Sequence, residues 1–506
     1  MDLKSFFKKN WTHFAVLAVF LIVTIAYFSP DFDGYSLKQH DIEQFKGMSN
    51  ETKHFRDATG DEPFWTNSMF GGMPTVQIST LYHGNVFQTI TKWFLLHMGV
   101  PSGIFFLHLV GFYILALCLR IKPVVAVFGA FAFALSTYEI LILQAGHNSK
   151  AIAVAFMAPV LGAFIMSYRN NWKWGVVLSS LFMAFELSAN HLQVTYYLGG
   201  LLFCLGLYEL VSVFKTKAFK QFAMTSAGLI GAYTVALLIN YGNITATNDY
   251  AKHTIRGAND LAISPDGSEA KNTGGLDVDY ITNWSYGVGE SFTFLSPYVK
   301  GSHSNILANM PFKEQLERSG RSSSEIKSVL SASYLQADGR GGVQGRPFLL
   351  YWGEQPITSG PFYLGVVVLF LAILLLVFVK DRIKWVFFAV TILALTLSWG
   401  KNFMGLTEFF IDYIPGYNKF RTVTIVNVLI ELCIPLMGVL FLQKIYENRE
   451  VFKSKKKTFL ISSAFSLIVL LGITFVGIGD NFTNPTEVNN MRNIDSYVAA
   501  QLYSTS

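Results

Sequence analysis

The sequence contains few charged residues for its length. Of its 506 residues, 14% are Asp, Glu, Lys or Arg, 52% are hydrophobic, and the mean hydropathy is +0.38. An average soluble protein is about a quarter charged, so most of this chain does not face water. The composition therefore excludes a disordered chain, a nucleic-acid-binding module and an ordinary soluble enzyme, and it indicates a helical protein that crosses the membrane several times.

Cysteine and nucleotide-binding motifs are also scarce. The three cysteines, Cys118, Cys204 and Cys433, lie inside apolar runs, where a thiol is usually a small buried hydrophobic group, and they predict neither a disulfide framework nor a metal site. The glycine-rich run at 338–342 has no strand-to-helix setting and is not a phosphate-binding loop. Direct transport driven by ATP is therefore excluded.

Long apolar runs recur along the chain. Runs of about 17 to 25 residues can cross a hydrocarbon core as helices. The first of them is an uncleaved anchor rather than a signal peptide, because residues 26–30 form a poor cleavage site. The sequence predicts eleven membrane-spanning helices, at 11–29, 101–119, 123–142, 151–168, 174–189, 193–214, 221–241, 361–379, 385–399, 422–442 and 458–477.

Charge in the connecting segments predicts the orientation. Alternate connections hold 19 basic residues against four acidic ones, and loops this rich in Lys and Arg are cytoplasmic by the positive-inside rule. We therefore expect a cytoplasmic N-terminus, with the long connections on the outer face.

Four parts of the chain follow from this topology. Residues 1–241 form an N-terminal transmembrane module with a first outer loop at 30–100, in which 86–100 predicts an interfacial or re-entrant helix. Residues 242–360 form a large outer loop with a helical stretch at 311–335. Residues 361–477 are C-terminal transmembrane helices, and 478–506 are an outer tail.

Acidic residues follow the first span closely. Asp41 and Glu43 lie about a dozen residues after it, next to the predicted interfacial helix. A partly desolvated carboxylate at such a position can act as a general base on a bound acceptor. The alternative is a solvated loop acid.

Two short outer turns each carry a histidine. His147 and Lys150 belong to the turn between the third and fourth spans and could face one phosphate; the alternative is a turn held by Asn148 with a Lys that extends to the interface. His191 and Gln193 belong to the next outer turn. Two histidines at membrane depth predict a shared polar cavity, although such residues are often only interfacial.

Three more candidates come from the C-terminal half. Arg421 precedes the tenth span, where a guanidinium can bind phosphate, or serve as an interfacial anchor. Lys401 follows the ninth span, and Glu354 lies beside Trp352, which offers a stacking face for a sugar.

An ordered set of short motifs resembles the YfhO-like bacterial membrane proteins, which look like GT-C superfamily glycosyltransferases. The motifs are Asp41-X-X-Gln44-Phe45, Pro63-X-Trp65 with Phe70-Gly-Gly-Met-Pro74, Gly146-His-Asn, His191-Leu-Gln and Pro415-Gly-Tyr-Asn-Lys-Phe-Arg421. The resemblance covers nearly the whole chain. It implies an all-α fold and an enzyme that transfers a sugar from a polyprenyl-phosphate donor to an envelope glycan, lipid or protein on the outer face.

By the same resemblance Asp41 matches the acidic residue of the first outer loop, where such enzymes keep their catalytic carboxylate. Members of the group are often longer, so an end at Ser506 raises the question of a missing outer domain. The sequence contains no dedicated metal-ligand cluster, although a divalent cation could share the stabilisation of the leaving phosphate. A secondary transporter and a noncatalytic assembly or lipid-handling protein are the alternatives.

Overall fold

The computed structural model describes residues 3–257, 274–306, 336–337, 343–344, 349–448, 450 and 456–478. The predicted helix at 311–335, the glycine-rich run at 338–342 and the tail after 478 lie outside these residues. The described part is predominantly helical, and its strands form three antiparallel two-stranded sheets. This agrees with the all-α membrane class.

A helix lies in each of the eleven predicted ranges. The helices in or directly next to these ranges are α1 Leu3–Tyr27, α6 Val100–Cys118, α7 Pro123–Ala134, α8 Thr137–Ala145, α9 Asn148–Arg169, α10 Trp172–Ser188, α11 Leu192–Thr216, α12 Phe219–Ile239, α17 Val366–Phe378, α18 Ile383–Ser398, α19 Met404–Tyr413, α20 Val428–Glu447 and α22 Lys456–Ile478. Within the described residues, six of the helices are long and apolar enough to span a membrane, or up to eight spans if each of two bent pairs counts as one. Eleven spans therefore remain a prediction.

The third predicted span, 123–142, is not one straight helix. It divides into α7 and α8, which meet at an angle of 45°, and Ser136 between them has an extended backbone. Thr137 Oγ1 donates to the carbonyl of Pro361 at 2.7 Å and accepts from the backbone N–H of Tyr363 at 2.7 Å. The polar groups at the break are satisfied by the distant segment 361–363. The sequence around residue 136 therefore did not predict the break. Helix α17 starts at Val366, after Gly365 with φ +90°, and not at the predicted 361.

The second bent helix pair is α18 with η4 and α19, and it lies near the long connection 242–360. After α18 the chain turns by 112° into the 3-10 helix η4 (Gly400–Phe403) and α19. Two further 3-10 helices, η5 (Tyr417–Lys419) and η6 (Val423–Asn427), lead into α20. The predicted start of the tenth span at 422 therefore falls before η6, and its α-helix starts at Val428.

The core is formed by α6, α9 and α10 together with α20. Most residues in the apolar stretches of α9 and α20 are buried inside the protein, whereas most residues in the apolar stretches of α1 and α12 are not. Two glycines let α6 and α9 approach closely: a Cβ at Gly111 would lie 2.3 Å from the Ala155 carbonyl oxygen, and one at Gly162 would lie 2.7 Å from Leu115 Cα. Small residues at helix contacts are the usual device for close packing in membranes.

The first long connection forms several short elements. These are α2 Ser29–Phe32, α3 His40–Met48, α4 Asn50–Thr59, β1 Trp65–Thr66 paired with β2 Met73–Pro74, the 3-10 helix η1 Thr75–Gln77 and α5 Val86–Met98. The helix predicted at 86–100 is α5, which exposes Val86, Ile90, Trp93 and Leu96. This apolar face is consistent with an interfacial position.

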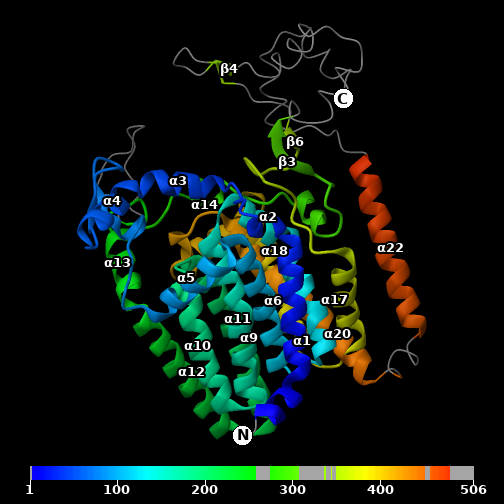
Figure 1. The fold of residues 1–506 in the computed structure, drawn as a ribbon. Coiled ribbons are helices and arrows are strands. Elements are labelled where there is room, and N and C mark those ends of the chain that lie inside the picture. The colour runs from blue at the N-terminus through cyan, green and yellow to red at the C-terminus, as the bar shows by residue number, and fades with distance from the viewer. Residues whose placement is uncertain are drawn as a thin grey trace, which may run out of the picture.

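The second long connection contributes α13 Tyr241–Ala251, α14 Val278–Thr282, the 3-10 helix η2 Gly289–Phe294, β3 Gly301–Ile306 paired with β6 Leu349–Tyr351, and the pair β4 Gln336–Ala337 and β5 Val343–Gln344. Figure 1 shows α3, α4, α14, β3 and β6 at one end of the bundle and the N-terminus at the opposite end. The two long connections therefore lie on the same side, as the charge pattern predicts. Which side is cytoplasmic remains a prediction.

Candidate functional site

Helix α3 is attached to the turn between α8 and α9. The side-chain amide of Gln39 donates to the Leu143 carbonyl at 2.6 Å and to Asn148 Oδ1 at 2.9 Å, and Asn148 Nδ2 donates back to Gln39 Oε1 at 3.2 Å. Gly146 ends α8 with φ +94°, and a Cβ there would lie 3.2 Å from the backbone nitrogen of Ile42. Glycine is thus needed for both the conformation and the close approach.

This attachment brings Asp41 against His147. Asp41 Oδ2 lies 3.0 Å from His147 Nε2, and the two side chains are 48% and 43% exposed. The pair joins the first outer loop to the turn after the third predicted span, a separation of about a hundred residues. Solvent can therefore reach the pair, and one carboxylate oxygen is held in place.

Lys150 and His191 are close enough to influence this pair. Burial and the positive charge of Lys150 lower the pKa of His147, and the facing Asp41 opposes this effect. Burial, Lys150 and His147 lower the pKa of His191 to about 4. Both imidazoles are therefore neutral at neutral pH, and they can offer hydrogen bonds to a ligand rather than full charges.

His191 also begins α11. Its Nδ1 accepts a hydrogen bond from the backbone N–H of Val194 at 3.4 Å, a side-chain N-cap. Because Nδ1 accepts, the proton of the neutral ring is on Nε2. Lys150 is 7% exposed, and its Nζ lies 5.3 Å from the centre of the Tyr138 ring. The charge of Lys150 thus lies beneath the turn rather than on the surface.

Arg421 and Gln193 form a second group. Gln193 Nε2 donates to the Arg421 carbonyl at 2.9 Å, so the turn that carries His191 contacts the segment before η6. The Arg421 guanidinium donates to Tyr280 Oη at 2.6 Å and stacks 5.4 Å from the centre of that ring. Its side chain is therefore directed to the second long connection.

The other predicted residues do not join the Asp41 pair. Glu43 forms an exposed ion pair with Lys46 at 2.8 Å, which lowers the pKa of Glu43 through a hydrogen bond and charge. Lys401 is exposed, and its backbone N–H donates to Ser285 Oγ at 2.9 Å. Glu354 is exposed, and its backbone N–H donates to Glu290 at 3.1 Å.

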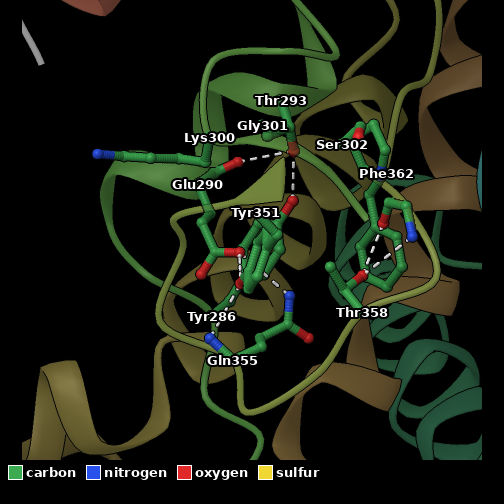
Figure 2. Close-up of a pocket in the computed structure, with 12 residues that line it drawn as sticks. Tyr286, Glu290, Thr293, Lys300, Gly301, Ser302, Tyr351, Gln355, Thr358 and Phe362 are labelled. Atoms are coloured by element: carbon green, nitrogen blue, oxygen red, sulfur yellow. Dashed lines mark hydrogen bonds between the residues drawn. The ribbon is translucent and has the colours of Figure 1, made fainter. Parts of the chain in front are cut away.

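A buried network around Glu290 was not found from the sequence. Its carboxylate accepts from Tyr351 Oη, from Gln355 Nε2 at 3.2 Å, and from the backbone N–H groups of Gly287 at 2.6 Å and Glu354 at 3.1 Å. Figure 2 shows Glu290, Tyr351 and Gln355 pointing toward one another. Burial raises the pKa of Glu290 despite these donors. No sequence signal joined Glu290 in one loop to Tyr351 some sixty residues later.

The cavity beside Glu290 has a volume of about 10 Å³ and is lined by residues that include Tyr286, Thr293 and Phe362. A water molecule needs about this much space, so the cavity is too small for a sugar. Within the part of the chain that the structure describes, no group of three or more His, Cys, Asp or Glu residues could hold a metal ion.

Comparison with known proteins returned no matching family model, no matching curated protein and no matching solved structure.

Proposed function

We propose that this protein is a membrane glycosyltransferase of the YfhO-like, GT-C type. It would move a sugar from a polyprenyl-phosphate donor to an envelope acceptor on the outer face of a bacterial cytoplasmic membrane. The observation that carries the proposal is the contact between Asp41 and His147, at the end of the bundle where the long connections gather. The ordered motifs of the sequence support the same assignment.

The chemistry is a single inverting displacement. Asp41 takes the proton of an acceptor hydroxyl while that oxygen forms a bond to the anomeric carbon and the lipid phosphate leaves with the bonding electrons. His147 Nε2 donates to one oxygen of Asp41 and leaves the other for the acceptor. His147 is thus a positioning residue for the base.

The leaving phosphate carries the negative charge that needs most stabilisation. Lys150 supplies positive charge near the pair, and His191 offers a neutral Nε2–H donor from the next turn. Gln193 holds the backbone of Arg421, whose guanidinium contacts Tyr280, and we place that guanidinium at the edge of the donor site. A lipid-linked donor would enter between helices with its phosphate against these groups.

The test is transfer of a radiolabelled sugar from a polyprenyl-linked donor by the purified full-length chain. We expect Asp41→Asn to lower the rate of transfer about 100-fold or more while donor binding persists. Asp57→Asn is the matched control, because Asp57 is an exposed carboxylate of the same outer loop, and it should transfer at the normal rate. Undiminished transfer by the Asp41 variant would remove Asp41 as the base.

A secondary transporter is the second candidate, favoured by the two broken helix pairs. Interrupted helices often form the substrate sites of such proteins. Reconstitution into sealed vesicles separates the two: a transporter would accumulate solute along an ion gradient with Asp41 intact or changed, whereas a glycosyltransferase would make product without a gradient.

A further inference from the structure

Three ionisable side chains from three helices meet inside the bundle. His108 of α6, Glu139 of α8 and Glu431 of α20 are 1%, 1% and 0% exposed. Glu139 lies in the first turn of α8, just after the break from α7. No residue of the Asp41 site belongs to this cluster, although the charge of Lys150 acts on both Glu139 and Asp41.

The contact between His108 and Glu139 requires a proton. His108 Nδ1 lies 2.8 Å from the Ile104 carbonyl oxygen, which can only accept, so Nδ1 carries a hydrogen. His108 Nε2 lies 2.7 Å from Glu139 Oε2. A neutral Nε2 and an ionised carboxylate would both present lone pairs at this distance and would repel. One proton must therefore be bound to Nε2 or to Oε2.

Glu431 requires a proton for a different reason. Neither of its carboxylate oxygens has a hydrogen-bond partner among the described residues, and Glu139 and the Ser136 hydroxyl are close enough to act on its charge. An ionised carboxylate that is buried without donors costs several kcal/mol. Both side-chain amide atoms of Asn427, one helical turn earlier, are likewise buried without a partner, so Asn427 does not donate to Glu431, and the Ser136 hydroxyl alone among the described residues can offset the burial of its charge.

The surrounding charges do not change this conclusion. The other titratable groups that act on the cluster are Lys150 of α9, Tyr138 of α8 and Tyr286 of the second long connection. Lys150 is attracted by Asp41 as well as by Glu139. Lys150 is attracted more strongly by Glu139 than by Asp41, and it is not among the groups that act on Glu431, so Lys150 does not compensate an ionised Glu431.

We infer that His108, Glu139 and Glu431 form an intramembrane proton-binding site that holds two protons at neutral pH. One is shared by His108 and Glu139, and the other is on Glu431. Loss of the second proton would place two carboxylates of α8 and α20 against each other, so its release requires either a compensating cation or separation of these helices. The break between α7 and α8 is the joint at which such separation would occur.

The test is infrared spectroscopy of the full-length protein in detergent at neutral pH, recorded in normal and in heavy water. A protonated carboxylic acid has a carbonyl absorption separate from that of an ionised carboxylate. We expect Glu431→Gln to remove one such carboxylic acid absorption and to leave the carboxylate absorption unchanged. If the variant instead removes carboxylate absorption, Glu431 is ionised and the inference is wrong.

Glu186→Gln is the matched control. Glu186 is also fully buried, but Thr195 Oγ1 donates to it at 2.9 Å and it lies on α10. This variant must retain the absorption that Glu431→Gln removes. A wild-type protein without any carboxylic acid absorption would also overturn the inference, whether or not the variants fold.

Sodium provides a further arm. Spectra of the wild-type protein in sodium chloride and in choline chloride should be the same, because the site binds protons. If sodium alone abolishes the absorption assigned to Glu431, the ligand is a metal cation and the proton assignment fails.

Discussion

Asp41 and Glu290 are both acids of the outer connections, and their surroundings are opposite. Asp41 is half exposed, and its one ion-pair partner among the described residues is His147 at 3.0 Å. Glu290 is 2% exposed and accepts four hydrogen bonds from Tyr351, Gln355 and two backbone N–H groups. The acceptor capacity of Glu290 is therefore filled by the protein, whereas Asp41 retains capacity for a ligand.

The number of hydrogen bonds that each carboxylate accepts, and its access to solvent, distinguish a structural acid from a candidate catalytic one. A saturated buried carboxylate stabilises the loops that donate to it, because removing one partner leaves buried donors unsatisfied. A carboxylate with one positioning contact and access to solvent can exchange a proton with a bound molecule.

The largest effects should come from replacing the carboxylate by an amide at Asp41 and at Glu290. Asp41→Asn should lower sugar transfer about 100-fold with the same melting temperature. Glu290→Gln should lower the free energy of unfolding by about 2–4 kcal/mol, because an amide nitrogen would face donors, while transfer per folded molecule stays near normal. Thermal melting and transfer assays on both variants check this, and the contrast fails if the two variants behave alike.

The second prediction concerns the attachment of α3. Gly146→Ala should lower transfer about tenfold, because a Cβ at φ +94° is strained and would press against Ile42. Gly47→Ala is the control on α3 itself, where nothing lies within 4 Å of the added Cβ. Equal rates for the two variants would show that the position of α3 does not matter to the site.

Arg421 should have a smaller effect than the attachment of α3. Arg421→Leu should weaken binding of the polyprenyl-phosphate donor about fivefold and leave acceptor binding unchanged, because the guanidinium is exposed and reaches phosphate only at the edge of the site. Tyr280→Phe keeps the stacked ring but removes the hydroxyl that accepts from Arg421; it serves as the control. Equal weakening of donor and acceptor binding would count against a phosphate role.

The smallest effect is a pH dependence of stability. The folded pKa of His191 is about 4, below the ordinary value of about 6.5, so between these pH values the unfolded chain binds more protons than the folded one. Stability should therefore fall as pH falls from about 6.5 toward 4. Burial also lowers the pKa of His147, so His147 contributes to the same pH range. His191→Asn keeps an N-cap residue and should reduce, without abolishing, the slope of the melting-temperature curve in this range. An unchanged curve would exclude His191 as its source.

Much of the fold could be predicted from composition and hydropathy. A helix lies in every range that was predicted as a span, because long apolar runs can satisfy their backbone only as helices in lipid. The break after Leu135 could not be predicted, since it depends on hydrogen bonds from Thr137 to the distant segment 361–363. The count of eleven spans therefore remains open even though the helices themselves are present.

The candidate site was predictable only in part. The chemistry of Asp41 and His147 indicated a polar site, and the structure brings these two together with Lys150 and His191 close enough to act on their charge. Gln39, which holds α3 in place through Asn148, gave no sequence signal because an amide near a turn is common. Glu290 was missed for a related reason: three of its partners, Tyr351, Glu354 and Gln355, lie about sixty residues further along the chain.

Low charge and recurrent apolar runs by themselves determined that this chain is a helical membrane protein, and the placement of Lys and Arg indicated how its loops alternate. Which polar residues come into contact depends on the tertiary structure. The contacts require the left-handed conformation of Gly146, the reciprocal amide hydrogen bonds of Gln39 and Asn148, and helix packing between segments about a hundred residues apart. Hydropathy is summed over residues that are neighbours in the sequence, whereas the contacts of Asp41 with His147 and of Glu139 with His108 join residues that are distant in the sequence.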